Sequence, residues 1–212
     1  MWIAVGNGTS NNMAYSYDGV NWTGLGKPVF STSGSSVAWN GVMWITVGTG
    51  TVNTMAYSYN GLNWVGLGTT PFSTAGYSVK WNGTIWVAVG SGTNAIAWSR
   101  DGITWTGLGV TNAATGFLTT GNGVFWNGQI WMACGQGSGS TGVTVYSFNG
   151  KTWYSSNNVL FDTTIYGIAY NSYFTNKLIL NNYGTVGGTQ TLDIVGDTYY
   201  QSGYSQLIVN IS

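Results

Sequence analysis

A turn motif that recurs four times constrains this chain more than any other feature. Each copy places an Asp-Gly or Asn-Gly pair between a serine and a tryptophan. Such pairs tolerate positive φ and are the strongest local signal for a β-hairpin. The key positions of the copies are Ser16, Asp18, Gly19 and Trp22; Ser58, Asn60, Gly61 and Trp64; Ser99, Asp101, Gly102 and Trp105; and Ser147, Asn149, Gly150 and Trp153. The motif predicts one hairpin per repeat.

The polar residues of the motif are expected to support the turn. The serine hydroxyl and the Asp or Asn oxygen can accept hydrogen bonds from backbone N–H groups that the turn leaves unpaired. Asparagine replaces aspartate in two of the four copies, at Asn60 and Asn149. The replacement keeps a hydrogen-bond acceptor but removes the carboxylate that acid-base chemistry or metal binding needs. The motif is therefore interpreted as a structural element.

The motif belongs to a longer repeat. Met1-Trp2-Ile3 aligns with Met43-Trp44-Ile45, an offset of 42 residues, and periods of this length are typical of β-propellers. Within each repeat, turn residues separate four short apolar segments, which predict an up-and-down sheet of four strands, that is, one propeller blade. A fifth, degenerate copy lacks the Ser-x-Asp-Gly motif.

The chain is predicted to be all-β and to form a single closed five-bladed propeller of four-stranded antiparallel blades. The last six residues match the first-strand pattern and would complete the first blade, leaving no free sheet edge at the junction. Four blades followed by a disordered tail is the alternative. The predicted blades are 207–212 together with 2–30, then 36–72, 78–118, 123–162 and 167–204.

The sequence Ser-x-Asp-Gly-x-x-Trp resembles the Asp-box, or BNR-type, repeat of sialidase-like propellers, which also occurs in repeat proteins predicted in giant viruses. The resemblance covers nearly the whole chain. In that family the box is structural and lies on the face away from the sialidase active site. Sialidases share an arginine triad, a Tyr-Glu nucleophile pair and an acid Asp. This chain has one arginine, Arg100, and no glutamate, so the resemblance implies the blade architecture and not the enzyme.

Composition argues against several classes of function. Charged residues make up 5% of the chain and the net charge is zero, so no basic stripe is available for nucleic acid. No run of 18 apolar residues predicts a membrane-inserted helix. The chain contains no histidine, and we expect no metal and no cofactor. Asp193 and Asp197 are close in sequence, but relaxed turn chemistry in the degenerate repeat explains them better than a carboxylate pair. We expect no enzyme activity and a monomer.

Two further columns of residues are expected to be core. Cys134 aligns with Val47 and Val89, which predicts a buried small side chain. The tryptophans recur at equivalent positions of the first strand, the second strand and the hairpin. Such columns are what packing between blades requires, since each ring can bury roughly 150 to 250 Å². We therefore interpret the tryptophans as core residues and not as sugar platforms.

The expected function is non-enzymatic binding, with a neutral glycan or another protein as partner. Alternating strand direction places the polar loops between second and third strands on one face, where weak repeated sites would gain avidity. A structural or scaffold propeller without a small-molecule ligand, such as a virion or surface component or an engineered repeat protein, is the alternative. Asn7-Gly8-Thr9 and three other segments match the glycosylation sequon, as chance alone gives in an Asn-rich chain. The compartment is left open, with an extracellular or virion-surface location favoured. The candidate ligand-binding residues are Asn11, Asn53, Asn94 and Ser138.

Overall fold

The computed structural model describes residues 1–110, 118–137, 142–156 and 161–170. By their contacts, the residues of the chain divide into two units, Met1–Tyr173 and Phe174–Ser212. The second unit lies outside the described residues. Most of the predicted fifth blade and the predicted closing strand at 207–212 therefore lie outside the described residues.

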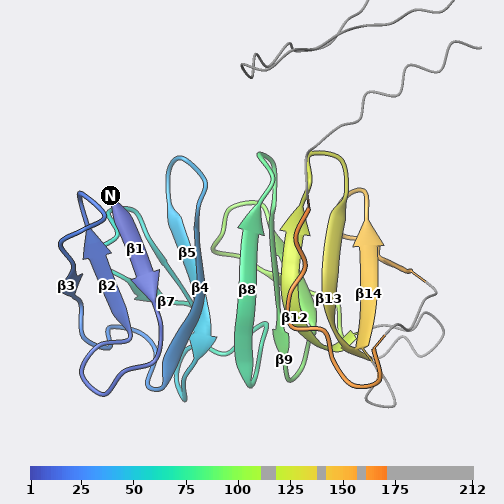
Figure 1. Ribbon diagram of the computed structural model, residues 1–212, viewed down its shortest axis with the longest axis horizontal. Helices are drawn as coiled ribbons and strands as arrows, with labels where there is room; N and C mark the ends of the chain where they lie inside the picture. Colours follow the sequence, from blue (N-terminus) through green and yellow to red (C-terminus); the bar gives the residue numbers. More distant parts are fainter. Residues whose placement is uncertain (111–117, 138–141, 157–160, 171–212) are drawn as a thin grey trace, which may run out of the picture. The chain divides into compact units, whose positions relative to one another are not determined.

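The described residues form four antiparallel sheets and contain no helix. In each sheet the strands follow one another in chain order (Figure 1). The first sheet comprises β1 (Trp2–Val5), β2 (Met13–Ser16) and β3 (Thr23–Gly24). The second comprises β4 (Ser33–Trp39), β5 (Trp44–Thr49), β6 (Met55–Ser58) and β7 (Val65–Gly66). The third comprises β8 (Ala75–Trp81), β9 (Trp86–Ser91), β10 (Ile96–Ser99) and β11 (Thr106–Gly107). The fourth comprises β12 (Leu118–Trp126), β13 (Trp131–Gly137), β14 (Gly142–Ser147) and β15 (Tyr154–Ser155).

The three complete sheets confirm the predicted unit of four antiparallel strands. Their first strands begin earlier than predicted, at Ser33, Ala75 and Leu118 instead of positions 36, 78 and 123. A β-bulge between Gly34 and Ser36 explains the difference in the second sheet, because an extra residue interrupts the alternation from which the strand was predicted. The same irregularity recurs in β8. The bulged segment joins the preceding sheet, since the Gly34 backbone N donates to the Gly6 carbonyl at 2.9 Å.

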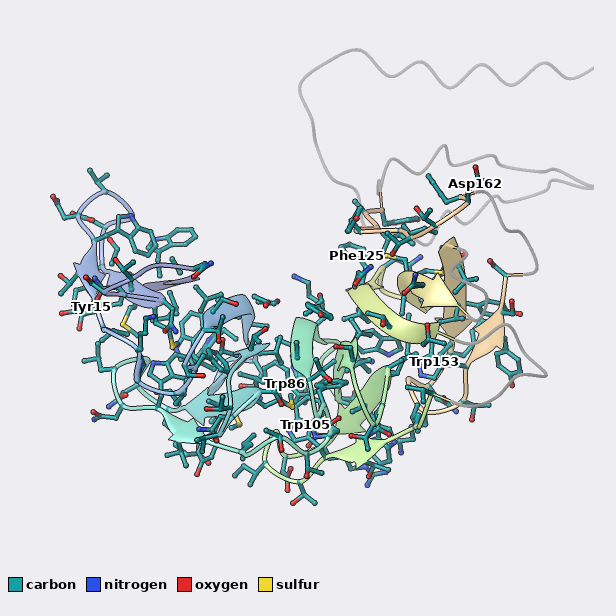
Figure 2. All side chains as sticks on the ribbon, turned by 90° about the horizontal axis from the view of Figure 1, so that it is seen from below. Tyr15, Trp86, Trp105, Phe125, Trp153 and Asp162 are labelled. Atoms are coloured by element: carbon teal, nitrogen blue, oxygen red, sulfur yellow. The ribbon has the colours of Figure 1, made fainter. Side chains whose placement is uncertain are left out.

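Apolar clusters join each sheet to the next. Met43, Ile45 and Phe72 of the second repeat pack with Val79 and Trp86 of the third. Similar clusters lie between the first and second sheets and between the third and fourth. The motif tryptophans Trp64, Trp105 and Trp153 each contribute to the cluster on the side of the preceding sheet, and Figure 2 labels Trp105 and Trp86, which belong to one of these clusters. The core of the unit therefore lies between sheets.

First-strand and second-strand tryptophans of the same sheet meet as tilted pairs, a contact that their columns did not predict. Trp39 is 42% exposed, so it is not the core residue that was expected. The ring centroids lie 4.9 Å apart for Trp39 and Trp44, and the third and fourth sheets repeat the contact at 5.0 and 5.1 Å. Trp86 and Trp131 are fully buried. The first sheet differs, because β1 has no further strand beside it among the described residues, and Trp2 is 61% exposed.

The segment after the fourth sheet begins as the earlier connections do but forms no strand where one was predicted. The Ile165 backbone N donates to the Gly135 carbonyl at 3.2 Å, and Asn122 Nδ2 donates to the Ile165 carbonyl at 2.9 Å. Residues 167–170, predicted as the start of the fifth blade, are not in a strand. Strand geometry requires a paired neighbour, and the predicted partner at 178–180 lies outside the described residues.

Strand directions divide the connections between two faces. In Figure 1, β2, β8 and β14 run upward while β1 runs downward. The Asp-Gly and Asn-Gly hairpins that follow the third strands therefore share one end of the sheets, which we call the box face. The loops between second and third strands, such as residues 6–12 and 50–54, share the opposite end with the connections between sheets. We call this end the loop face.

Candidate functional site

The predicted turn motif has the same hydrogen bonds in all four copies. The serine hydroxyl accepts a bond from the backbone N of the motif glycine, at 2.8 Å from Ser58 to Gly61. The Oδ1 of the Asp or Asn accepts from two further backbone N–H groups, which for Asn60 belong to Leu62 and Asn63, both at 2.9 Å. The tryptophan Nε1 donates to the glycine carbonyl, at 3.0 Å from Trp64. The other copies repeat the pattern.

These bonds stabilise the ionised form of the two motif carboxylates. The Asn21 backbone N–H is the main cause that holds the pKa of Asp18 well below its usual range, with further bonds from the Asn21 side chain and the Val20 backbone. The Thr104 backbone N–H is the largest cause for Asp101, whose pKa is lowered to about 2. A carboxylate held ionised in this way is a poor proton donor or acceptor near pH 7.

The motif glycine is required for two reasons. Gly150 has a φ of 71°, a conformation that side chains other than glycine rarely adopt. A Cβ at this position would lie 2.6 Å from Cδ1 of Ile85 and 3.0 Å from Cγ2 of Val87, both in the preceding sheet. Gly102 has the corresponding contacts with Met43 and Ile45 of the second sheet. The hairpins of the second, third and fourth repeats therefore close against the repeat before them, whereas Gly19 of the first repeat meets only Trp2 of its own sheet.

The candidate ligand residues of the loop face make internal contacts. Asn53 Oδ1 accepts from the Gly68 backbone N at 2.9 Å, and Asn53 Nδ2 donates to the Val29 carbonyl at 3.3 Å. Asn94 makes the equivalent bonds, with Gly109 N at 2.7 Å and the Pro71 carbonyl at 2.6 Å. The structure therefore gives these asparagines a role that the sequence analysis missed, which is to hold the loop against the neighbouring connections.

The remaining two candidates differ in how much the structure describes. Asn11 Oδ1 accepts from the Gly26 backbone N at 2.7 Å, so its oxygen has the same structural role as that of Asn53. Ser138 lies outside the described residues. The structure does not gather Asn11, Asn53 and Asn94 around one cavity, because each belongs to the loop of a different sheet. Their role in ligand binding stays a prediction.

A hollow of about 420 Å³ opens on the loop face of the first sheet. All of its lining residues are polar or glycine, and those of the loop include Asn7 and Thr9, whose side chains hydrogen-bond to no other described residue. From the sequence these two residues were expected in a polar loop of this face and in a sequon, but they were not among the candidate ligand residues. One sequence signal could have indicated the hollow. Hydroxyl residues occur both in the loop, at Thr9, and in the connection to the second sheet, at Ser31 and Thr32. The lining residues are Asn7, Gly8, Thr9, Lys27, Ser31 and Thr32.

Burial and clustering characterise two further kinds of reactive group in the described part of the chain, the cysteine and the residue types that could bind a metal. Cys134 is fully buried, as its column predicts, and burial raises the pKa of its thiol to about 11. In the described part of the chain, no three His, Cys, Asp or Glu side chains come together as a metal site would require. Asp193 and Asp197 fall outside the described residues. The same described ranges hold no helix that is long and apolar enough to cross a membrane.

No protein-family model matches the chain, and no curated protein matches it significantly.

Proposed function

We propose that this chain is an Asp-box repeat protein whose sheets are the blades of a closed five-bladed propeller, and that it is a non-enzymatic module that binds neutral glycans through its loop face. The architecture and the ligand are supported by different observations, and each has its own test.

Ring closure is supported by the exposure of two tryptophans in the first sheet. Trp2 is 61% and Trp22 is 47% exposed, whereas their counterparts in the fourth sheet, Trp131 and Trp153, are buried. Trp131 stacks on a first-strand tryptophan, and Trp153 packs against the third sheet. A first strand formed by residues 207–212 and a fifth sheet beside it would cover Trp2 and Trp22 in the same way.

A disulfide between the two ends would test this closure. In the second sheet Val37 lies opposite Thr46, and the equivalent pair in the first blade would be Leu207 and Ala4. Because directly opposed residues have Cβ atoms roughly 4.5 to 5.5 Å apart, Ala4→Cys with Leu207→Cys should oxidise readily in a Cys134→Val background.

The control for the disulfide is Ala4→Cys with Tyr204→Cys, which is three residues out of register. Rapid oxidation of the first pair alone is the expected result on a non-reducing gel. No disulfide in either variant, or equal yields in both, would contradict closure and favour four blades with a tail.

The ligand proposal depends mainly on the hollow of the first sheet. Its wall offers hydroxyl and amide groups of Asn7, Thr9 and Thr32 that have no other partner among the described residues. Hydroxyl and amide groups both donate and accept hydrogen bonds, which suits the hydroxyls of a neutral sugar. Lys27 is the one charged residue of the lining. The hollow therefore offers few ion pairs to a charged ligand, and its hydrogen-bonding groups suit a neutral one. Equivalent loops in other sheets would add avidity.

Binding to an array of neutral glycans, followed by variants of the hollow, would test this assignment. Thr9→Val with Thr32→Val removes two hydroxyl groups from exposed positions and should abolish the binding of glycans that occupy the hollow, without changing the melting temperature. Lys27→Thr copies the residue at the equivalent position 69 and should leave binding unchanged, as should added salt. Loss of binding in Lys27→Thr would show an anionic ligand and contradict the proposal.

A scaffold role without a small ligand is favoured by one observation. The amide groups of Asn53 and Asn94, predicted to contact ligand, hold the loops to the backbone of neighbouring connections. No binding to any glycan of a broad neutral panel, by a protein that is folded and monomeric, would replace the binding proposal with this one.

A further inference from the structure

The box face carries exposed aromatic rings at equivalent positions of three repeats. Tyr17, Tyr59 and Phe148 each follow the motif serine, and they are 70%, 59% and 67% exposed. In the fourth repeat the exposure of Phe148 contrasts with the burial of Trp131 and Trp153. Exposed aromatic residues that recur at one position indicate an interaction surface more strongly than single exposed residues do.

Each exposed ring is held in a defined orientation by a second ring of the preceding strand. Tyr17 meets Tyr15 at 5.6 Å between centroids with an interplanar angle of 78°. Tyr59 meets Tyr57 at 5.7 Å and 79°. The fourth sheet repeats this edge-to-face contact at 5.9 Å and 85°. Such a contact favours one orientation of the ring, and an oriented ring loses less conformational entropy when a ligand stacks on it.

Polar groups adjoin each ring on the same turn. Next to Tyr59, the Oδ1 of Asn60 binds the turn backbone, while its Nδ2 donates to no described residue. Next to Phe148, Asn149 has the same arrangement. An aromatic face attracts the C–H groups of a sugar ring through its quadrupole, and an adjacent amide N–H can donate to a sugar hydroxyl. A purely apolar partner would leave that amide unsatisfied.

The third repeat departs from the pattern. Arg100 replaces the exposed ring, and Trp98, which replaces its supporting tyrosine, lies under the Nζ of Lys151 at 4.2 Å from the ring centroid. Stacking of nucleic-acid bases would need a positively charged groove beside the rings. The chain has only five lysines and arginines, balanced by five acids, which favours an uncharged ligand.

We propose that Tyr17, Tyr59 and Phe148 are stacking subsites for a neutral sugar chain with exposed C–H faces, of the β-1,4-linked glucan type. This surface lies on the box face and is separate from the hollow of the loop face. Each ring stacks on one sugar unit. Asn60 and Asn149 donate to a hydroxyl of the unit on the adjacent ring, whereas Asp18, next to Tyr17, can only accept from one. The third repeat contributes no such subsite.

Calorimetric titration of the full chain with cellohexaose tests the proposal. The triple variant Tyr17→Ala, Tyr59→Ala and Phe148→Ala should bind at least tenfold more weakly at an unchanged melting temperature. Tyr17→Phe with Tyr59→Phe retains both rings and should bind within twofold of the unchanged chain. Arg100→Tyr should strengthen binding severalfold by adding a ring in the third repeat.

Three results would overturn the proposal. One is the absence of cellohexaose binding at millimolar concentration. Another is unchanged affinity in the triple variant together with loss of affinity in Thr9→Val with Thr32→Val, which would place the sugar in the loop-face hollow and leave the proposed function intact. The third is a wild-type dimer in sedimentation that the triple variant converts to a monomer, because the rings would then join two copies of this chain.

Discussion

Asn53 Oδ1 accepts a hydrogen bond from the Gly68 backbone N at 2.9 Å, although the two residues are fifteen positions apart. Asn11 with Gly26 and Asn94 with Gly109 repeat the bond. In each case the asparagine ties its loop to the end of the fourth strand of the same repeat. These contacts give the loop face its shape, and they are the reason that side-chain amides predicted to meet a ligand serve the fold.

The bond of Asn53 should contribute measurably to stability. Asn53→Ala leaves the Gly68 N–H and the Val29 carbonyl without this partner, so we expect the free energy of unfolding to fall by about 1 to 2 kcal/mol. Asn63→Ala is the matched control, because Asn63 is exposed and its side chain bonds to no described residue. Urea titration of both variants measures the two changes, and the control should change the free energy of unfolding by less than about 0.5 kcal/mol. Equal losses in both variants would contradict the structural role.

Two glycines of the fourth repeat separate backbone strain from packing. Gly128 has a φ of 99° with no atom within 4 Å of an added Cβ, whereas at Gly150 the Cβ would meet Ile85 and Val87. Gly128→Ala should cost about 1 to 2 kcal/mol from the left-handed conformation alone. Gly150→Ala should cost at least about 1 kcal/mol more, because it also overpacks the contact between sheets. Denaturant titration of both variants measures the difference. Equal losses of unfolding free energy would show that Ile85 and Val87 move aside for the added Cβ without a measurable penalty.

The motif carboxylates should make stability depend on pH in acid. The pKa of Asp101 is lowered to about 2 in the folded state, from an unfolded value near 3.8. Its contribution is therefore present above about pH 4 and is lost as the pH falls toward 2. Asp101→Asn should reduce the fall in unfolding midpoint between pH 4 and 2, and Asn60→Asp should increase it. No change in the acid slope for either variant would contradict the hydrogen-bond assignment.

Cys134 should behave as a core residue. Burial raises the pKa of its thiol to about 11, so a thiol reagent at pH 8 should label the native chain far more slowly than the chain in urea. Valine occupies the equivalent position of two other repeats, at Val47 and Val89. Cys134→Val should therefore change the free energy of unfolding by less than about 1.5 kcal/mol. Rapid native labelling would show that the fourth sheet opens or that this thiol is accessible.

The amino-acid sequence by itself determined the turns, the strand order within each repeat and the columns of core residues. All bonds of the motif lie within seven consecutive residues, from Ser58 to Trp64 for example. Local hydrogen bonds of this kind depend on residue type and spacing alone. The buried Cys134 was predictable for a related reason, because the repeat supplies the residues that occupy the same position in other sheets.

Only the tertiary structure decided which side chains remain available to a partner. The side chain of Asn53 bonds to Gly68 and Val29, which lie 15 and 24 positions away. The β-bulges interrupt the alternation on which strand prediction relies. The same tryptophan column is buried at Trp131 and exposed at Trp2 because only one of them has a packed neighbour among the described residues. Exposure and long-range hydrogen bonding depend on what the rest of the chain places alongside, and no local pattern encodes that.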